Sequence, residues 1–298
     1  MDADGHPLIF GEVLYDRFPD GSVVLGGAPF NVAWHLQAFG AAPLFVSRVG
    51  EDELGERIRA AMSRWGMSLK RLECDAQHAT GTVDVRFENG EPHYDIVTER
   101  AYDYISAAAA TDLRPTLIYH GTLALRGRVS AESLAALRTR LDAPVFMDVN
   151  LRAPWWDRDQ VRTGLDAARW VKLNEDELEL LGQDDSGTLE ARAGRLRERH
   201  DIELLIVTRG ARGALAFGAD GRRVEVSPPA GNTVVDTVGA GDAFTSVTIL
   251  GLTLGWPLQQ TLERAQDFAS AVVGVRGATV QERDFYRRFR EQWKLAQR

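Results

Sequence analysis

The sequence lacks the features that define several large classes of protein. Its 298 residues include one cysteine, Cys74, which excludes a disulfide scaffold or a cysteine-rich metal site and is typical of a reducing compartment. No apolar run approaches the roughly 18 residues of a membrane span. The first ten residues lack a basic segment followed by an apolar one, so no secretory signal is expected. We therefore expect a cytoplasmic protein with no membrane partner.

Positive charge is also scarce. The chain has 35 Lys and Arg against 43 Asp and Glu, a formal net charge of −8, which argues against a nucleic-acid partner. Only Lys70, Lys172 and Lys294 are lysines, so a lysine that binds phosphate has few candidates. The composition, 44% hydrophobic and 26% charged, is that of an ordinary globular protein with enough chain to bury a large core. An enzyme fits these limits.

Short apolar segments alternate with amphipathic ones along the chain. The apolar segments are rich in β-branched and aromatic residues, which is typical of strands, and two of the amphipathic segments end at a glycine, which is typical of helices. This alternation predicts a parallel sheet covered by helices on both faces. The predicted strands are residues 8–10, 44–46, 117–119, 145–147, 170–173 and 204–207, and the predicted helices are 29–39, 53–65 and 130–141, with an all-helical region from about 241 to 293.

One region breaks this rhythm. Residues 82–87 and 93–97 alternate between apolar and polar types on either side of Asn89-Gly90, and Asn-Gly between alternating segments is a strong hairpin signal. We interpret the hairpin as a small lid beside the main sheet, although an edge hairpin without a function would have the same pattern. No linker is long enough to separate two domains.

Glycines and acids converge in residues 232–244. A strand-like Val234-Val235 leads to Asp236, and the turn from Gly239 to Gly241 opens an apolar helix. Glycines let backbone N–H groups approach a ligand, and a helix N-terminus offers unpaired N–H donors with partial positive charge, so the segment predicts an anion site. Asp242 stands in the first helical turn, where the helix should keep it ionised and where it would take a proton from a nucleophile attacking phosphorus. A capped strand-to-helix turn would use the same residue types.

A second glycine pair lies near the N-terminus. Gly26 and Gly27 precede Pro29, which suits the first position of a helix, and Asn31 offers a donor and an acceptor to a hydroxylated ligand. A capped helix start explains these residues equally well. Glu12 and Asp16 flank the end of the first predicted strand, and open α/β sheets bind ligands at such strand ends.

Common nucleotide and hydrolase motifs are absent. The sequence contains no Gly-x-x-x-x-Gly-Lys-[Ser/Thr], no Gly-x-Gly-x-x-Gly after an N-terminal strand, no His-Glu-x-x-His and no Gly-x-Ser-x-Gly. These absences exclude a P-loop protein, a dinucleotide-binding fingerprint, a zincin and a nucleophile elbow.

Two long motifs carry a resemblance to a known family. Residues 26–33 (GGAPFNVA), continued by residues 47–55 (SRVGEDELG), and residues 236–244 (DTVGAGDAF) resemble the two signatures of the ribokinase-like, or PfkB, family of carbohydrate kinases. The resemblance runs over nearly the whole chain. It implies a three-layer α/β/α sandwich with a central, mostly parallel sheet. It also implies one domain, residues 1–298, with a β lid inserted at about 12–25 and 81–100.

The resemblance assigns roles to individual residues. It implies ATP and Mg²⁺ as cofactors, with the lid excluding water during phosphoryl transfer. Because the family's lids are often where subunits meet, it also implies a homodimer. The implied roles are: Asp242 as general base; the N–H groups of Gly239, Ala240 and Gly241 as anion hole; Asp16, Gly27 and Asn31 as sugar contacts; Asn174, Thr208 and Gly210 as ATP contacts; Glu177 as a Mg²⁺ contact through water; and backbone carbonyls around Asp236 and residues 274–277 as ligands for K⁺, whose involvement stays open.

The substrate is predicted less firmly than the reaction. The glycine motif and residues 148–152 are similar to those of bacterial fructokinases, with Arg152 and Tyr94 as further sugar contacts. The alternative, a 2-keto-3-deoxygluconate kinase, shares the Asp-x-Asn-x-Arg pattern and would use Arg152 or Arg100 to bind the substrate carboxylate. A third possibility is a catalytically silent sugar-binding regulator, although the intact Asp242 and glycine turn argue against it. We expect fructose.

Overall fold

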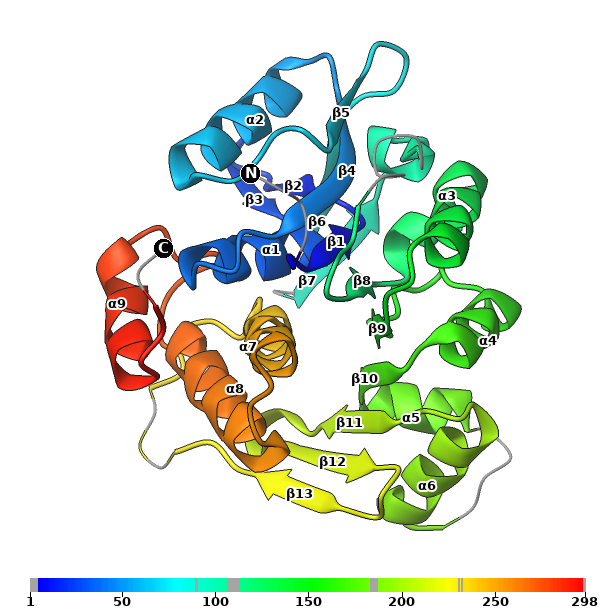
Figure 1. Cartoon of the computed structure of the whole chain (residues 1–298). Helices are drawn as coiled ribbons and strands as arrows, with labels where there is room; N and C mark the ends of the chain where they lie inside the picture. The colour runs from blue at the N-terminus through cyan, green and yellow to red at the C-terminus, as the bar shows by residue number, and fades with distance from the viewer. Residues whose placement is uncertain are drawn as a thin grey trace.

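Nine of the strands that the structure describes form one main sheet. The computed structural model describes residues 5–88, 91–106, 113–182, 187–229, 231 and 233–296. The strands lie in the order β13-β12-β11-β10-β9-β8-β1-β4-β5 (Figure 1), parallel from β11 to β5 and antiparallel at β12 and β13. Their bounds are β1 Leu8–Phe10, β4 Leu44–Gly50, β5 Leu72–Asp75, β8 Ile118–His120, β9 Val145–Asp148, β10 Trp170–Asn174, β11 Leu204–Thr208, β12 Ala214–Gly218 and β13 Arg223–Val226. The six predicted strands are confirmed among them.

Helices cover both faces of this sheet and produce two hydrophobic cores. On one side lie α1 (Ala28–Ala38), α2 (Glu53–Trp65), α7 (Ala240–Leu254), α8 (Leu258–Val273) and α9 (Arg283–Gln292), and on the other lie α3 (Arg128–Arg140), α4 (Arg158–Ala167), α5 (Glu175–Leu181) and α6 (Leu189–Arg199) (Figure 1). Three short 3₁₀ segments are η1 (Ala101–Tyr104), η3 (Leu123–Arg126) and η4 (Gly210–Arg212). The predicted α/β/α sandwich is confirmed. Among the described helices, none combines the length and the apolar composition of a membrane span.

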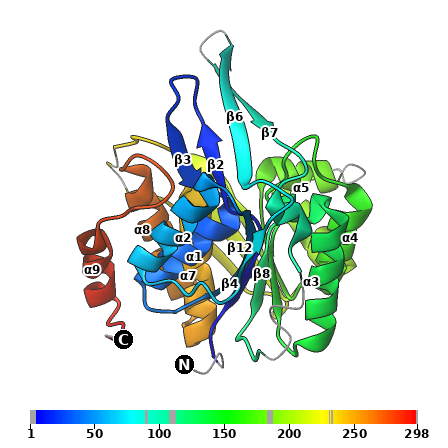
Figure 2. The ribbon, with the colours of Figure 1, turned by 90° about the horizontal axis from the view of Figure 1, so that it is seen from above.

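A four-stranded small sheet stands apart from the main one. It contains β2 (Leu14–Arg17), β3 (Val23–Gly26), β6 (Gly81–Glu88) and β7 (Glu91–Ile96) in the order β3-β2-β6-β7, and Figure 2 shows it projecting from one end of the main body. β6 and β7 are the predicted hairpin, whose Asn89-Gly90 turn lies outside the described residues. The sequence did not predict that β2 pairs with β6 in parallel, because the two strands are far apart in the chain.

The main sheet changes its direction of growth beside β1. β4 and β5 extend the sheet on one side of β1, whereas β8, β9, β10 and β11 extend it on the other. At such a switch point the connections leave the carboxyl ends of neighbouring strands in opposite directions, which opens a crevice for ligands. Only residues 11–13 separate β1 from β2, so the small sheet stands at this same edge.

One predicted strand is wrong. Val234 and Val235 are not in a strand but in an exposed loop, with side chains 65% and 57% exposed. The N–H groups of Val235 and Asp236 donate to the carbonyl of Val273 at the end of α8, at 2.9 and 3.1 Å. Because a helix end supplies the acceptor, the β-branched pair needs no neighbouring strand.

Candidate active site

Asp242 and Asn31 meet where α7 begins beside α1. The Asn31 Nδ2 group donates to Asp242 Oδ2 at 2.8 Å, although the two residues are 211 positions apart. Asn31 Oδ1 is buried and has no hydrogen-bond partner among the residues that the structure describes. The fold therefore unites the two glycine-containing motifs and leaves one acceptor free between them.

The environment of Asp242 raises its pKa to about 6. Loss of hydration is the largest cause, opposed by the hydrogen bond from Asn31 and reinforced by the negative charge of Asp148. Lys172 and Arg152 also lower the pKa by their charges. At pH 7 most of these carboxyl groups are ionised and able to accept a proton.

The glycine turn before α7 contains two glycines with different requirements. Gly239 has a φ of 79°, and a Cβ there would lie 2.5 Å from Ala278, so both conformation and packing demand glycine. A Cβ on Gly241 would make only ordinary contact, 3.6 Å from Lys172 Nζ, and Gly241 has no positive φ. The fold therefore does not require glycine at position 241. Because Gly241 has no side chain, nothing from this residue covers the N-terminus of α7. The N–H of Ala240 already makes a long hydrogen bond to Thr237 O, at 3.3 Å, which a bound anion would have to replace.

A buried ion pair lies beneath this turn. Lys172 Nζ donates to both oxygens of Asp148 at 2.9 and 2.8 Å, and the two side chains are 8% and 2% exposed. Thr245 Oγ1 lies 2.9 Å from Asp148 Oδ2 and 2.9 Å from the carbonyl of Gly241. Sequence reasoning missed this network. The available signal was a lysine inside an otherwise apolar strand, which needs a buried partner.

Two acids follow β1 closely in the chain: Glu12 lies just after it and Asp16 lies in β2. Burial raises the pKa of Asp16 to about 6, and the charge of Arg152 opposes that rise. Gly27 has a φ of 106°, and a Cβ there would lie 2.8 Å from the carbonyl oxygen of Glu12. The exposed Arg152 also lowers the pKa values of Glu12 and Asp242. The charge of Arg152 therefore acts on three carboxyl groups.

Tyr94 is the predicted site residue that lies furthest out. Its side chain is 57% exposed on β7. Tyr94 pairs with Val85, whereas Asp16 pairs with Val83, and residues two apart on a strand share a face. Tyr94 is therefore on the same face of the small sheet as Asp16, one step further from the main sheet, and the structure gives it no contact with Asp242 or Asn31.

The predicted ATP contacts lie at the carboxyl ends of β10 and β11. Asn174 pairs with Thr208 in register, and Gly210 follows with a φ of 55° and open space around it. Asn174 Oδ1 caps α5 by accepting from the N–H of Glu177 at 2.8 Å. The Glu177 carboxylate accepts from the N–H groups of Asn174 and Leu151 at 2.9 and 2.7 Å, and burial raises its pKa.

Asp236 joins the loop before α7 to the segment after α8. Its Oδ1 accepts from the N–H of Val238 and its Oδ2 from the N–H of Gly277, each at 3.0 Å. The two backbone segments expected to offer carbonyls to a monovalent cation are thus adjacent. That they bind one stays a prediction.

The second half of the first motif lies away from these residues, at the base of the small sheet. Asp52 Oδ1 accepts from the N–H of Gly55 at 2.8 Å, which caps α2, and Asp52 also accepts from the N–H and hydroxyl of Thr80, each at 2.7 Å. Thr80 directly precedes β6. The motif therefore fastens the small sheet to the main body.

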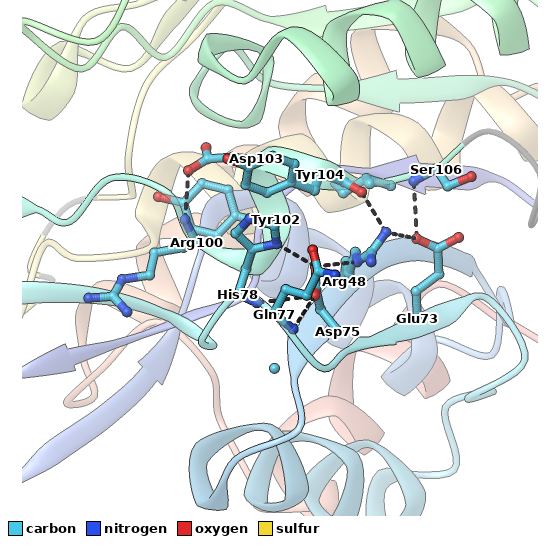
Figure 3. Close-up of polar contacts among 12 residues, drawn as sticks. Arg48, Glu73, Asp75, Gln77, His78, Arg100, Tyr102, Asp103, Tyr104 and Ser106 are labelled. Carbon is cyan, nitrogen blue, oxygen red and sulfur yellow. Dashed lines mark hydrogen bonds and ion pairs between the residues drawn. The ribbon is translucent and has the colours of Figure 1, made fainter.

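A second set of contacts reinforces the same base (Figure 3). Arg48 Nε lies 2.8 Å from Asp75 Oδ2, and its Nη1 donates to the carbonyl of Tyr104 at 3.0 Å. The ring of His78 stacks on that of Tyr104 at 3.6 Å and bonds to Asp75 at 2.9 Å. The chain segments before β6 and after β7 are thereby held together. We refer to Arg48, Asp52, Asp75, His78 and Thr80 as the clamp.

Comparison with known proteins identifies the class. Residues 1–284 match the model of the pfkB family carbohydrate kinases. A fructokinase of Klebsiella pneumoniae is 31% identical over 267 residues, covering 84% of this chain and 85% of the relative. The fructokinase of Vibrio cholerae O395, solved with fructose, ADP and calcium ion, has a TM-score of 0.82 at 24% identity, covering 96% and 99% of the two chains. The aminoimidazole riboside kinase of Salmonella enterica has a TM-score of 0.78 at 26% identity, covering 94% and 95%.

These findings, together with the fold, make the protein a sugar kinase, a phosphotransferase that uses an alcohol group as acceptor. The chain belongs to the PfkB family of carbohydrate kinases. Membership of a kinase family implies ATP with a divalent cation.

Proposed function

We propose that the protein transfers the γ-phosphate of ATP to a hydroxyl of fructose, with Asp242 as the general base and the N–H groups of Gly239, Ala240 and Gly241 as the anion hole. The observation that carries the proposal is the 2.8 Å hydrogen bond between Asn31 and Asp242. It joins a hydroxyl-binding side chain to an acid in the first turn of a helix.

The side chains divide the work of one phosphoryl transfer. Asn31 and Asp16 hold sugar hydroxyls, and Asp242 accepts the proton of the attacking hydroxyl. The hydroxyl oxygen then forms a bond to the γ-phosphorus while the bond from that phosphorus to the β–γ bridging oxygen of ATP breaks. The N–H donors at the start of α7 stabilise the negative charge on the transferred group. Lys172 and Asp148 fix the turn through Thr245.

The residues present fit Mg²⁺ bound mainly by the nucleotide. Among the described residues, no group of three His, Cys, Asp or Glu side chains is arranged to hold a metal ion directly. Each oxygen of Glu177 already accepts one N–H and keeps a further lone pair. Such a carboxylate suits a contact through water, and Mg²⁺ usually retains several waters. The cation supplies neutralisation of the phosphate charge when ATP binds.

Charge around Arg152 favours a neutral sugar over a sugar acid. Glu12, Asp16 and Asp242 all feel its charge, so a substrate carboxylate would compete with three acids for one guanidinium. Arg100 is the other candidate for binding a carboxylate, and its charge acts on Asp84. Asp16 pairs with Val83, and Asp84, the next residue of β6, lies on the opposite face of the small sheet. The likeness to the Klebsiella fructokinase supports the same choice.

The small sheet supports two further parts of the proposal. The face that carries Asp16 also carries Val24 and Tyr94, which are 43% and 57% exposed. We propose that this face covers the sugar and meets the small sheet of a second copy in a homodimer. Sedimentation velocity would detect the dimer, and Val24→Arg should dissociate it, whereas a monomeric wild-type protein would contradict it.

Release of ADP from Mg-ATP tests the activity, with and without K⁺. The panel is fructose, ribose, 2-keto-3-deoxygluconate, glucose, tagatose and adenosine. Turnover with fructose above the rest supports the full proposal. Turnover only with the keto acid would keep Asp242 as base and make Arg152 the carboxylate ligand. Sugar binding without turnover on any substrate would indicate the silent regulator.

A further inference from the structure

Glu12 is a buried acid at the centre of the sugar-binding edge that the mechanism above does not use. It lies in residues 11–13, between β1 and β2, and is 3% exposed. Its Oε2 is buried and has no hydrogen-bond partner in the part of the chain that the structure describes. The close approach of Gly27 to the Glu12 carbonyl fixes this segment against the start of α1.

Charged groups from three other parts of the chain act on Glu12. Burial is the largest effect on its carboxyl group and raises the pKa to about 7. A hydrogen bond from its own backbone N–H and the charges of Arg152 and Arg126 lower the pKa, and the charge of Asp242 raises it. Among the described residues no hydrogen bond or ion pair joins Arg126 to Glu12: Arg126 pairs with Asp103 at 2.8 Å, and its Nη1 is buried without a hydrogen-bond partner. The acceptor Glu12 Oε2 and the donor Arg126 Nη1 are therefore both buried and unpaired among the described residues.

An unpaired buried carboxyl oxygen weakens folding, since its lost hydration is not replaced. Other buried acids in this chain avoid that loss: Glu177 and Asp148 have hydrogen bonds to both oxygens. We infer that Glu12 is a substrate-binding residue whose Oε2 accepts a hydrogen bond from a sugar hydroxyl other than the one that Asp242 deprotonates. This inference rests on the proposed sugar kinase activity and extends its set of sugar contacts.

Steady-state kinetics of Glu12→Gln and Glu12→Ala test the inference. The control is Glu73→Gln, which removes a half-buried acid at the base of the small sheet, where Glu73 accepts from the N–H of Ser106 at 3.1 Å. We expect Glu12→Ala to raise the sugar KM about tenfold or more, the size of one hydrogen bond to a charged group. The ATP KM should stay within about twofold. Glu73→Gln should change neither.

A series of monodeoxy sugars identifies the hydroxyl. The analogue that lacks the hydroxyl bound by Glu12 should lose affinity with the wild type and lose none with Glu12→Ala, because the interaction is already absent. If Glu12→Ala does not fold, Glu12→Gln, which has the same shape, serves in its place. A sugar KM within twofold of wild type in both folded variants overturns the inference.

Failure of the inference is separable from failure of the proposed function. If the wild type phosphorylates a sugar and the variants keep its KM, only the inference falls. If the wild type phosphorylates none of the panel but binds one by calorimetry, weaker binding by Glu12→Ala supports the inference without the activity. If the wild type binds no sugar at all, both are wrong.

Discussion

Two groups of acids in this molecule have pKa values that are shifted in opposite directions. In the clamp, burial alone would raise the pKa values of Asp52 and Asp75, but hydrogen bonds from Thr80 to Asp52, and from Gln77 and His78 to Asp75, outweigh it and lower them. At the candidate active site burial prevails. It raises the pKa values of Asp16 and Asp242 to about 6 and that of Glu12 to about 7.

The difference lies in how completely each carboxylate is hydrogen-bonded. Asp52 accepts three hydrogen bonds from two chain segments, so its charge serves to hold the fold together. Asp242 accepts one from Asn31 and keeps its remaining lone pairs for a ligand. Perturbed acids with spare acceptor capacity in a crevice are candidates for chemistry, whereas saturated acids are candidates for architecture. Asp52 and Asp242 both stand in motifs of the same family, and only their contacts distinguish them.

The largest effect should follow from Asp242→Asn. The amide keeps the shape and one acceptor oxygen but cannot take a proton, so kcat should fall by about 10²–10⁴. Calorimetry should show sugar and ATP affinities close to those of the wild type. A variant that turns over near the wild-type rate would remove Asp242 from the role of base.

Asp52→Ala should lower the stability of the fold and leave catalysis nearly unchanged. It removes the cap of α2 and leaves the N–H and hydroxyl of Thr80, which is 1% exposed, without acceptors. We expect the free energy of unfolding in urea to fall by about 2–3 kcal/mol, with kcat at 25 °C within a few-fold of wild type. The neighbouring exposed Glu51→Ala is the control and should be nearly neutral. A large loss of kcat with unchanged stability would move Asp52 into the functional group.

The pH profile of kcat/KM should report the base. Because Asp242 must be ionised, kcat/KM should decline about tenfold per pH unit below its pKa of about 6. Asp16 and Glu12 titrate nearby, so Asn31→Ala separates them. It removes the donor that lowers the Asp242 pKa, and the acid limb should move to higher pH. An unmoved limb would assign the titration to another acid.

Much of the fold was predictable because its signals are local. Parallel strands buried on both faces appear in the sequence as continuous apolar segments. The ends of α2 are marked by Asp52 at its start and by Gly66, with a φ of 83°, at its end. The pairings between distant segments were not predictable. β2 against β6 and Lys172 with Asp148 depend on which faces meet after collapse, and β-branched Val234-Val235 failed as a strand because α8 supplied its acceptor.

The candidate site divides in the same way. The resemblance pointed to Asp242, Asn31 and the glycine turn, and the structure brings these together. It did not assign a role to Glu12 or Arg126, because burial without a partner is a property of packing that no residue pattern encodes. The charge of Arg152 acts on both Asp16 and Asp242, whereas Tyr94 lies exposed on β7.

The smallest effect concerns how the free energy of unfolding changes with pH. The direction of this change tests the comparison between the two groups of acids most directly. The folded-state pKa of Asp242, about 6, exceeds its ordinary value near 4. Between these values the folded state holds more protons than the unfolded chain, so the contribution of Asp242 is lost as pH rises through about 6. Asparagine does not titrate. Asp242→Asn should therefore gain stability relative to the wild type between pH 4 and pH 8, by about 1–2 kcal/mol.

Asp75→Asn should behave in the opposite way. The folded-state pKa of Asp75 lies below its ordinary value, so the unfolded chain binds the proton more readily, and the stabilisation by the carboxylate is present at neutral pH and lost as pH falls. The variant should be less stable than the wild type at pH 7, and the difference should shrink toward low pH. Urea unfolding of both variants at pH 4, 6 and 8 measures the two signs. If they agree, the distinction between saturated and unsaturated acids does not hold in this protein, because hydrogen bonding and burial would then have failed to separate the two groups.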